Sequence, residues 1–415
     1  MKVVHISSEI YGGAFIAALR LHDAMLKQGV DSIYLTSHDR DEIKKIYPVS
    51  RGKFDNAIRR TYKFRESFLK KRVYKSTIFP AFYGFNISKH PFVKNADYIV
   101  LHWIVASFLS IKEIKKILEL GKPVFWLLHD QWPLTGGCHY SHDCKRYETG
   151  CGFCPFSERK SQKDLSFKVI QSKLKNISYY ENLTIIPTSR WLEECSLNSI
   201  VFKNKKVIRI PYPIDLKIFT PLKEGKQKAR QLLSLPLTKK LICFGASEAV
   251  RNGNKGWPYI VEAVNKIKDR NSDYELIVFG SERDESLEKS LSLPIHFMGH
   301  IRDLNKLTMC YNAADVFVMP SIVEAWGQTG TESLSCGTPV VGFNTGGIRD
   351  YVFHKQTGYL AEYKNSDDLA NGILWVLEDG DQSELSLNAR TLCEDRFEES
   401  IIANRWLKLF SSKNI

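Results

Sequence analysis

The segment PSIVEAWGQTGTESLSCGTPVV, residues 320–341, decides the fold. An apolar strand ends at Pro320, a glycine-bearing loop follows, and a helix is predicted to begin near Gln328 or Thr329. A second apolar strand begins at Pro339. Strand, helix and strand in this order form a βαβ unit, whose two strands lie parallel in one sheet. The backbone N–H groups at the start of such a helix favour an anion, and a diphosphate suits them.

Two carboxylates accompany this helix start. Glu324 precedes the turn, and Glu332 lies about one turn inside the predicted helix. A carboxylate at position 332 can accept hydrogen bonds from the paired hydroxyls of a ribose, while Glu324 can reach another part of the same ligand. The plainer interpretation is a helix start with acidic residues that complement its dipole. The two glutamates alone therefore do not establish a ligand site.

The same alternation of short apolar strands and helices runs through the chain. A length of 415 residues predicts two domains of roughly 200 residues each. A break at residues 211–213 predicts a first domain over residues 1–213 and a second over 214–397, with a C-terminal helix at 398–415 that packs back on the first. The predicted strands are Val3–Ile6, Ser32–Thr36, Tyr98–Leu101, Pro123–Leu128, Thr184–Ile186, Val207–Ile210, Leu241–Phe244, Glu275–Phe279, Ile295–Phe297, Val316–Met319 and Pro339–Gly342. Two doubly wound parallel sheets in tandem would hold a ligand in the cleft between their strand carboxyl ends.

Composition excludes several classes of protein. Apolar residues make up 43% of the chain and charged residues 25%, as in ordinary globular proteins. No run approaches the roughly 20 apolar residues that span a bilayer. The apolar start is too short for a signal peptide, so we expect a cytoplasmic protein. Its nine cysteines should then be reduced or metal-bound.

The formal net charge is +13, and residues 51–75 concentrate it. They hold ten Lys or Arg residues against Asp55 and Glu66, with aromatic residues between them. A basic, aromatic-containing helix suits an anionic membrane surface, here the inner face of the cell membrane. The alternative is a solvated helical face whose aromatic residues point to the core. Nucleic acid is disfavoured, because no base-reading motif accompanies the charge.

A cysteine cluster is the most unusual local feature. Cys138, Cys144, Cys151 and Cys154 fall within seventeen residues, and the last two have the C-x2-C spacing of a zinc knuckle. Four thiolates would form a closed, tetrahedral, structural zinc site. The alternative is four small loop or buried thiols that bind no metal.

Several motifs together resemble retaining glycosyltransferase family 4, which has the GT-B fold of two Rossmann-like doubly wound domains facing across a cleft. The glutamate-containing segment at 320–341 matches the family signature, and further matches follow the family's order along nearly the whole chain. They are YGGA at 11–14, LLHD at 127–130, PTSR at 187–190, IPYPID at 210–215, KG at 255–256, FMGH at 297–300, YNAADV at 311–316, TGG at 345–347 and TGYL at 357–360. The segments HWI at 102–104, HDQWPLTGGCHY at 129–140 and CGFCP at 151–155 look like a branch that builds bacterial capsular and exopolysaccharides, similar to colanic-acid-type enzymes.

The resemblance implies a role for each matching residue. Lys255 would neutralise the leaving diphosphate, Glu324 would bind hydroxyls of the transferred sugar, and Glu332 would bind the ribose. His129 would hydrogen-bond the sugar or phosphate from the first domain, which makes the implied catalytic set His129, Lys255 and Glu324. The implied donor-binding residues are Gly12, Gly13, Arg251, Lys255, Gly299, His300, Ile301, Glu324, Gly327, Gln328, Thr329 and Glu332. Arg251 stands in for an arginine that many relatives place five or six residues before the lysine.

The implied reaction moves a hexosyl or N-acetylhexosaminyl group, with retention, from a UDP- or GDP-sugar to a glycan acceptor linked to polyprenyl diphosphate. The acceptor hydroxyl would attack the face from which the diphosphate leaves, so no cofactor and no protein nucleophile would be required. Other GT-B enzymes, such as a glucan synthase or a nucleotide-sugar epimerase, remain alternatives. A dinucleotide-dependent oxidoreductase is disfavoured, because no G-x-G-x-x-G follows the first strand. A zinc-stabilised nucleic-acid binder is a further distant alternative.

Overall fold

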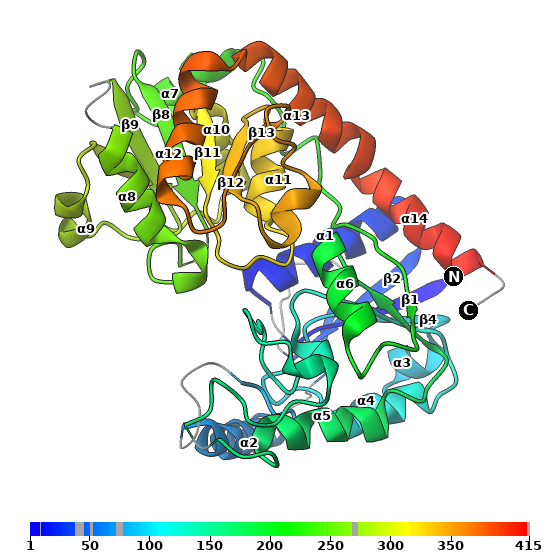
Figure 1. The fold of residues 1–415 in the computed structure, drawn as a ribbon. Coiled ribbons are helices and arrows are strands. Elements are labelled where there is room, and N and C mark those ends of the chain that lie inside the picture. The colour runs from blue at the N-terminus through cyan, green and yellow to red at the C-terminus, as the bar shows by residue number, and fades with distance from the viewer. Residues whose placement is uncertain are drawn as a thin grey trace. The chain divides into compact units, whose positions relative to one another are not determined.

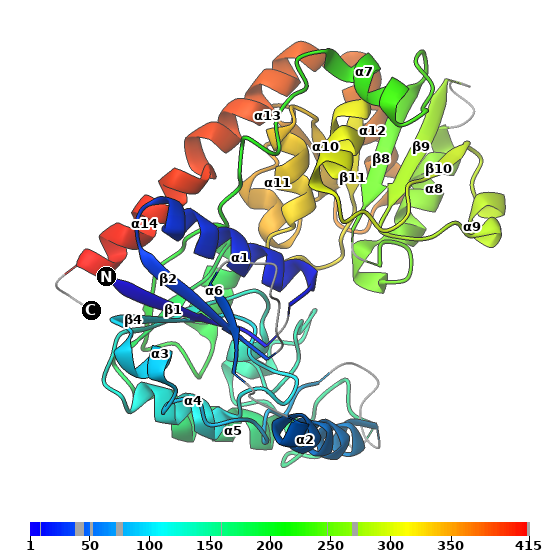
Figure 2. The same ribbon diagram turned by 180° about the vertical axis from the view of Figure 1, so that it is seen from behind.

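The computed structural model describes residues 1–8, 10–37, 45–49, 53–71, 78–158, 160–246, 248–267 and 273–412. The chain divides into two compact units, Met1–Pro211 with Ala403–Ile415, and Tyr212–Ile402. Each unit is a parallel sheet with helices on its faces (Figures 1 and 2). The predicted pair of doubly wound parallel-sheet domains is therefore confirmed.

The first unit holds a seven-stranded sheet in the order β3-β2-β1-β4-β5-β6-β7. All of its strand pairs are parallel. Its elements are β1 (Lys2–Ile6), α1 (Gly12–Lys27), β2 (Asp31–Thr36), β3 (Ile46–Pro48), α2 (Lys53–Lys71), α3 (Pro91–Asn95), β4 (Tyr98–Leu101), α4 (Ile111–Leu118), β5 (Val124–Leu127), α5 (Leu165–Asn176), β6 (Leu183–Ile186), α6 (Arg190–Asn198) and β7 (Lys206–Val207). The strand order reverses between β1 and β4, and ligands of doubly wound sheets bind at such a reversal, outside the carboxyl ends of the strands.

The end of the last helix, α14 (Glu399–Ser411), belongs to the first unit. Phe410 stacks on Tyr98 of β4 with ring centroids 4.5 Å apart, and the Tyr98 hydroxyl donates to the Phe410 carbonyl over 2.7 Å. Trp406 meets Phe125 of β5 edge to face. These rings are apolar and Trp406 and Phe125 are fully buried, so the helix end is part of the sheet's own core.

The second unit holds a six-stranded sheet in the order β10-β9-β8-β11-β12-β13, again parallel throughout. Its elements are α7 (Gly225–Leu232), β8 (Lys240–Gly245), α8 (Trp257–Ile267), β9 (Tyr274–Phe279), α9 (Glu285–Ser290), β10 (Ile295–Phe297), α10 (Leu304–Ala313), β11 (Val316–Met319), α11 (Gln328–Ser335), β12 (Val340–Phe343), β13 (Gly358–Ala361), α12 (Ser366–Leu374), α13 (Gln382–Arg396) and the start of α14. Here the strand order reverses between β8 and β11, so the loops that follow these two strands meet.

A buried carboxylate fixes the amino end of this sheet. Asp315, directly before β11, accepts hydrogen bonds from the Arg230 guanidinium over 2.7 Å and from the Leu241 amide over 2.6 Å. The Lys226 ammonium lies 2.5 Å from its other oxygen. Burial alone would raise the pKa of Asp315, but these cations and the amide hold it below its usual value. The carboxylate thereby ties α7 to the two central strands.

One strand prediction needed correction, and two strands were missed. The strand expected at Val207–Ile210 pairs as β7 only over Lys206–Val207, although the amides of Ile208 and Ile210 still donate to carbonyls alongside β6. The short strands β3 and β13 were not predicted. Strands of three or four residues at a sheet edge leave little periodicity in the sequence. No helix among the described residues is long and apolar enough to cross a membrane.

Candidate functional site

In the second unit, the loops after β8 and β11 bring Lys255 and Glu324 together. The Lys255 ammonium lies 2.6 Å from the Glu324 carboxylate, although 69 positions separate the two residues in the chain. Glu324 is buried, whereas about a quarter of the Lys255 side chain is exposed. The lysine therefore holds a fixed positive charge at the carboxyl edge of the sheet, next to the start of α11.

Glycines allow these loops to approach one another. A Cβ on Gly256 would lie 1.9 Å from the Pro320 carbonyl oxygen, and Gly256 also has a φ of +77°, which other residues rarely adopt. A Cβ on Gly346 would lie 2.1 Å from the Glu324 carbonyl oxygen, which accepts the Gly347 amide over 2.9 Å. Three loops, after β8, β11 and β12, thus meet in backbone contact around Glu324.

The start of α11 has the features of an anion site. Gly327 is its N-cap in a left-handed conformation, no side chain caps it, and its first turn holds no acidic residue. The Tyr351 hydroxyl donates to the Gly327 carbonyl over 3.1 Å and would clash with a Cβ at Gly327 or Gly330. This tyrosine therefore shapes the turn while leaving the first amides of the helix to other partners.

Glu332 lies inside α11 and is buried. The Tyr311 hydroxyl, from α10, donates to its carboxylate over 2.7 Å. Burial and the neighbouring carboxylate raise the pKa of Tyr311 well above its usual value, so the tyrosine stays a hydrogen-bond donor. The structure thus gives Glu332 an orienting partner that the sequence analysis did not identify.

The other donor-side predictions lie nearby but without a shared contact. Arg251 is exposed, in the turn before Lys255. The Gly299 carbonyl accepts the Gly280 amide over 2.8 Å, which holds the segment 299–301 beside the end of β9. His300 is exposed, and Gln328 and Thr329 are partly exposed at the first turn of α11.

In the first unit, three histidines form a hydrogen-bonded row across β1, β4 and β5. His5 Nδ1 lies 2.9 Å from His102 Nε2, and His102 Nδ1 lies 3.1 Å from His129 Nε2. His5 and His102 are buried, and the Tyr34 ring stacks against both. Any ligand of the His129 ring must therefore compete with His102 for Nε2 or use Nδ1.

Burial keeps this row uncharged. It lowers the pKa of His129 to about 4, and it holds the pKa values of His5 and His102 well below the usual value. A neutral imidazole has one donor and one acceptor nitrogen, so each ring in the row must donate in the same direction. The tautomer of His129 is thereby coupled to those of the two buried rings.

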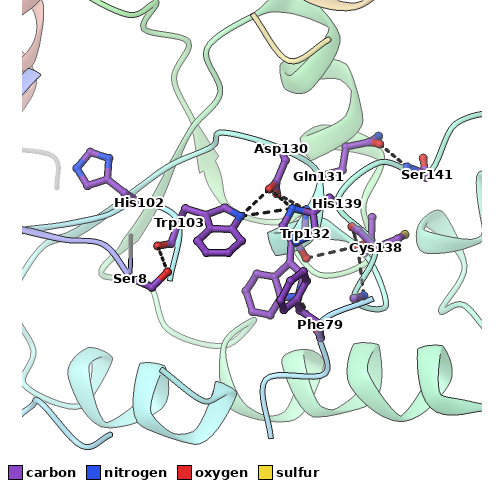
Figure 3. A network of polar contacts seen from close by, with 12 residues as sticks. Ser8, Phe79, His102, Trp103, Asp130, Gln131, Trp132, Cys138, His139 and Ser141 are labelled. Carbon is purple, nitrogen blue, oxygen red and sulfur yellow. Dashed lines mark hydrogen bonds and ion pairs between the residues drawn. The ribbon is translucent and has the colours of Figure 1, made fainter. Parts of the chain in front are cut away.

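Asp130 serves a different cluster from its neighbour His129. Figure 3 shows the Trp103 indole and the His139 ring directed at the Asp130 carboxylate. Trp103 Nε1 donates over 3.1 Å, His139 Nδ1 lies 2.6 Å away, and the Trp132 amide donates over 2.7 Å. Burial raises the pKa of Asp130, but His139 and the Trp132 amide outweigh it and keep the carboxylate charged.

Gly12 and Gly13 begin α1, just beyond the carboxyl end of β1. Gly12 has a φ of +85°, Tyr11 offers no side-chain cap, and the first turn of α1 holds no acidic residue. This helix start resembles that of α11 in these respects.

Comparison with known proteins finds a likeness in the second unit. Residues 226–391 match the family described as glycosyl transferases group 1. The match spans the β8, β11 and α11 loops described above, so Lys255, Glu324 and Glu332 all lie within the matched residues.

Two curated relatives extend the likeness beyond the matched residues. An uncharacterized glycosyltransferase of Methanocaldococcus jannaschii is 26% identical over 302 residues, which cover 68% of this chain and 74% of the relative. The N,N'-diacetylbacillosaminyl-diphospho-undecaprenol alpha-1,3-N-acetylgalactosaminyltransferase of Campylobacter jejuni is 30% identical over 217 residues, covering 50% of this chain and 54% of the relative. The chain thus spans only about half of the second relative's length.

Solved structures of similar fold cover the whole chain. Sucrose-phosphate synthase from Thermosynechococcus elongatus aligns with a TM-score of 0.68 at 19% identity, over 99% of this chain and 98% of that one. HepE of Anabaena, solved with UDP and glucose, aligns with a TM-score of 0.62 at 17% identity, over 99% of each chain. At these identities the likeness concerns the fold alone, and that fold is GT-B.

The four clustered cysteines line one small cavity of the first unit, together with Phe156. Burial raises the pKa values of Cys138 and Cys151 to about 12 and also raises that of Cys154. As the side chains stand, no three His, Cys, Asp or Glu residues in the described part of the chain are grouped to hold a metal ion. The metal site predicted from the cysteine spacing remains a hypothesis.

The sequence analysis missed His5, His102, Tyr311 and Tyr351. His102 and Tyr311 lie in the motifs at 102–104 and 311–316, but these motifs were used only to identify the family resemblance. Each of them contacts a residue of another strand, helix or loop. The signal that could have found them is position, since His5 and His102 lie at or just beyond the ends of strands that the Rossmann order makes adjacent.

The uncharged histidine row predicts how pH affects the first unit. An unfolded histidine binds a proton below about pH 6.5, whereas His129 stays neutral in the fold down to about pH 4. Stability is therefore complete above that window and falls as the pH drops through it, by about 3 kcal/mol from His129 alone. Hydrogen-exchange protection of β1, β4 and β5, measured across this range, should decline with the pH.

His129→Gln should make this decline shallower, because one buried titrating ring is lost. His354→Gln, in the second unit, serves as the matched control and should leave the decline unchanged. Protection of β1, β4 and β5 that stays constant across the range would contradict a neutral row.

Proposed function

We propose that this protein is a retaining glycosyltransferase that moves a hexosyl or N-acetylhexosaminyl group from a UDP- or GDP-sugar to a glycan hydroxyl. The acceptor is a lipid-linked glycan of bacterial surface polysaccharide synthesis. The observation that carries this proposal is the Lys255–Glu324 contact of 2.6 Å beside the uncapped start of α11, at the strand-order reversal of the second unit.

The chemistry follows from where the charges lie. Phosphate oxygens of the donor would accept hydrogen bonds from the Lys255 ammonium and from the amides of Gly327, Gln328 and Thr329. Glu324 would then be free of the lysine and could accept hydrogen bonds from hydroxyls of the transferred sugar. When the bond from the anomeric carbon to the phosphate oxygen breaks, negative charge grows where these donors already point. Because the lysine and the amides neutralise this charge, we propose that no divalent metal is needed for it.

Retention requires that the acceptor oxygen bond to the face of the anomeric carbon that the diphosphate leaves. The acceptor's proton passes to a phosphate oxygen, so atoms and charge balance without a protein nucleophile. Glu332, oriented by Tyr311, would accept the ribose hydroxyls. His129 would hydrogen-bond the sugar or the phosphate, with its tautomer set by His102.

The named relatives support the substrate class. The Campylobacter relative is named for an acceptor on undecaprenyl diphosphate, and HepE was solved with UDP and glucose. Sucrose-phosphate synthase shares the fold, and its name indicates a small soluble acceptor instead.

Lys255→Ala and Glu324→Gln should each lower sugar transfer by about two to three orders of magnitude, because each removes a charge aimed at the reacting groups. Lys255→Ala should also weaken the thermal stabilisation that UDP or GDP gives the wild type. The measurements are initial rates with saturating donor and melting temperatures with and without nucleotide.

Lys266→Ala is the matched control, since this lysine pairs with Asp367 on the surface of the same unit. It should transfer sugar like the wild type. Near-wild-type turnover in a folded Lys255→Ala or Glu324→Gln protein would remove this site from the proposal.

The product should keep the donor's anomeric configuration, and the sugar should be transferred to a polyprenyl-diphosphate-linked glycan in preference to a soluble glucan. Proton NMR of the new linkage decides the first point, and competition between the two acceptors decides the second. An inverted linkage would refute retention, while preference for the soluble glucan would favour a glucan synthase.

Helix α2 suggests how a lipid-linked acceptor is approached. Of the basic stretch predicted at 51–75, the structure describes residues 53–71, and these are helical. Phe64 and Phe68, one turn apart, are 73% and 52% exposed. Arg60 and Lys63 are exposed beside them, while Glu66 is buried and accepts from Ser107. We propose that this face rests on the anionic inner surface of the cell membrane.

The double variant Phe64→Ser, Phe68→Ser should lose most of its flotation with phosphatidylglycerol vesicles, because it removes the exposed apolar contact. Flotation with pure phosphatidylcholine vesicles should be weak for wild type and variant alike. Tyr179→Ser, which changes another exposed aromatic residue, is the control and should float like the wild type. Wild-type binding that ignores the anionic lipid content would refute the membrane contact.

A further inference from the structure

Four sulfur-bearing side chains that are spread over seventeen residues meet at a single cavity. Cys138, Cys144, Cys151 and Cys154 all line it, and its volume is about 20 Å³. This is room for one particle of the size of a water molecule. The lining of the cavity holds these four thiols, and thiolates are preferred ligands for soft metal ions.

Backbone lies close to two of the sulfur atoms before any ion is present. Burial raises the pKa values of Cys154 and Cys151, and it outweighs the backbone of Phe156 and Ser157, which lowers the pKa of Cys154, and the backbone of Gly136, which lowers that of Cys151. A Cβ on Gly136 would lie 2.9 Å from the Cys151 sulfur, so only glycine leaves room for this approach.

The loop that carries the cysteines is held in a strained shape. Four consecutive residues, Gly150, Cys151, Gly152 and Phe153, have φ angles of +116°, +58°, +85° and +45°. Left-handed backbone at a cysteine and a phenylalanine is costly, and it persists only where the surroundings impose it. The surroundings do so here through the Cys151 amide on the Arg146 carbonyl and the Cys154 amide on Asp164, at 2.7 and 2.8 Å.

Two basic side chains lie next to the cluster. Lys173 of α5 is fully buried, and its Nζ donates to the carbonyls of Trp132 and Thr135 and lies 3.8 Å from the Trp132 ring centroid. Burial lowers the pKa of Lys173 to about 7, while Cys138 and Cys151 act in the opposite direction, and Arg146 lines the cavity itself. A divalent ion on four thiolates carries two negative charges, which would favour the charged form of Lys173 and be balanced by it and by Arg146.

We propose that Cys138, Cys144, Cys151 and Cys154 bind one zinc ion in a closed tetrahedral site of the first unit. The four sulfurs are not grouped tightly enough to hold an ion as they stand. Each cysteine sulfur can be repositioned by rotation about a single side-chain torsion, and a bound ion would draw the four sulfurs to the Zn–S distance of about 2.3 Å.

The ion would act on structure and would take no part in sugar transfer. The loop between β5 and α5 carries Asp130 and His139 as well as the cysteines, and it begins next to His129. Zinc would anchor its far end, so that the Asp130 cluster holds one arrangement. This inference does not depend on the proposed function, because metal content and transfer are measured separately.

The test is the metal content of the full-length protein purified without chelators. Elemental analysis should give one zinc per chain, and X-ray absorption at the zinc edge should show a shell of sulfur alone at about 2.3 Å. Replacement by cobalt should produce thiolate-to-cobalt charge-transfer absorption with the ligand-field pattern of a tetrahedral site. These readouts use the wild-type chain, so they hold even where a variant fails to fold.

Cys138→Ser and Cys154→Ser should each lose stoichiometric zinc, whereas Cys310→Ser, at a buried cysteine of the second unit, should retain it. The proposal is overturned if the wild type holds no zinc even after reconstitution, or if nitrogen or oxygen dominates the shell. It also fails if both cysteine variants keep the metal, or if thiol titration finds a disulfide in the cluster.

Discussion

Parallel pairing at the point where strand order reverses is the constraint on which both candidate sites depend. In each unit the two central strands run side by side while their connections leave in opposite directions, so the loops at their carboxyl ends are not covered by a crossover helix. In the second unit that point lies between β8 and β11, whose loops carry Lys255 and Glu324. In the first unit it lies between β1 and β4, which supply His5 and His102. The same topology therefore places the charged Lys255–Glu324 pair at this point in the second unit and the row of neutral histidine rings at this point in the first.

The side chains of the two sites differ in charge. Lys255 is partly exposed and paired, so its charge costs little to keep and remains available to an anion. The histidines lie where burial removes their charge, and their directionality comes from hydrogen bonding alone.

Local chemistry was predictable from the sequence wherever one segment holds the whole motif. The run at 320–341 predicted the strand, the turn, the start of α11 at Gln328 and the position of Glu332. The family resemblance assigned Lys255 and Glu324 to one donor site, but their contact was not predicted, since no spacing rule links residues 69 positions apart. The histidine row was not predicted, because it requires β1, β4 and β5 to be neighbours, and only the Rossmann strand order, not the local sequence, indicates that. The edge strand β13 was missed because its four residues carry no clear alternation.

Three glycines limit which substitutions the chain can accept around Glu324. They are Gly256, Gly327 and Gly346. At each of them the space for a side chain is already filled, by a carbonyl oxygen at Gly256 and Gly346 and by side-chain atoms, including the Tyr351 hydroxyl, at Gly327. The walls around Glu324 are consequently made of main chain, whose shape cannot be altered by exchanging one residue for another. Substitutions can therefore change the surface around Glu324 only through the side chains that stand between these glycines, while the main-chain walls keep their shape.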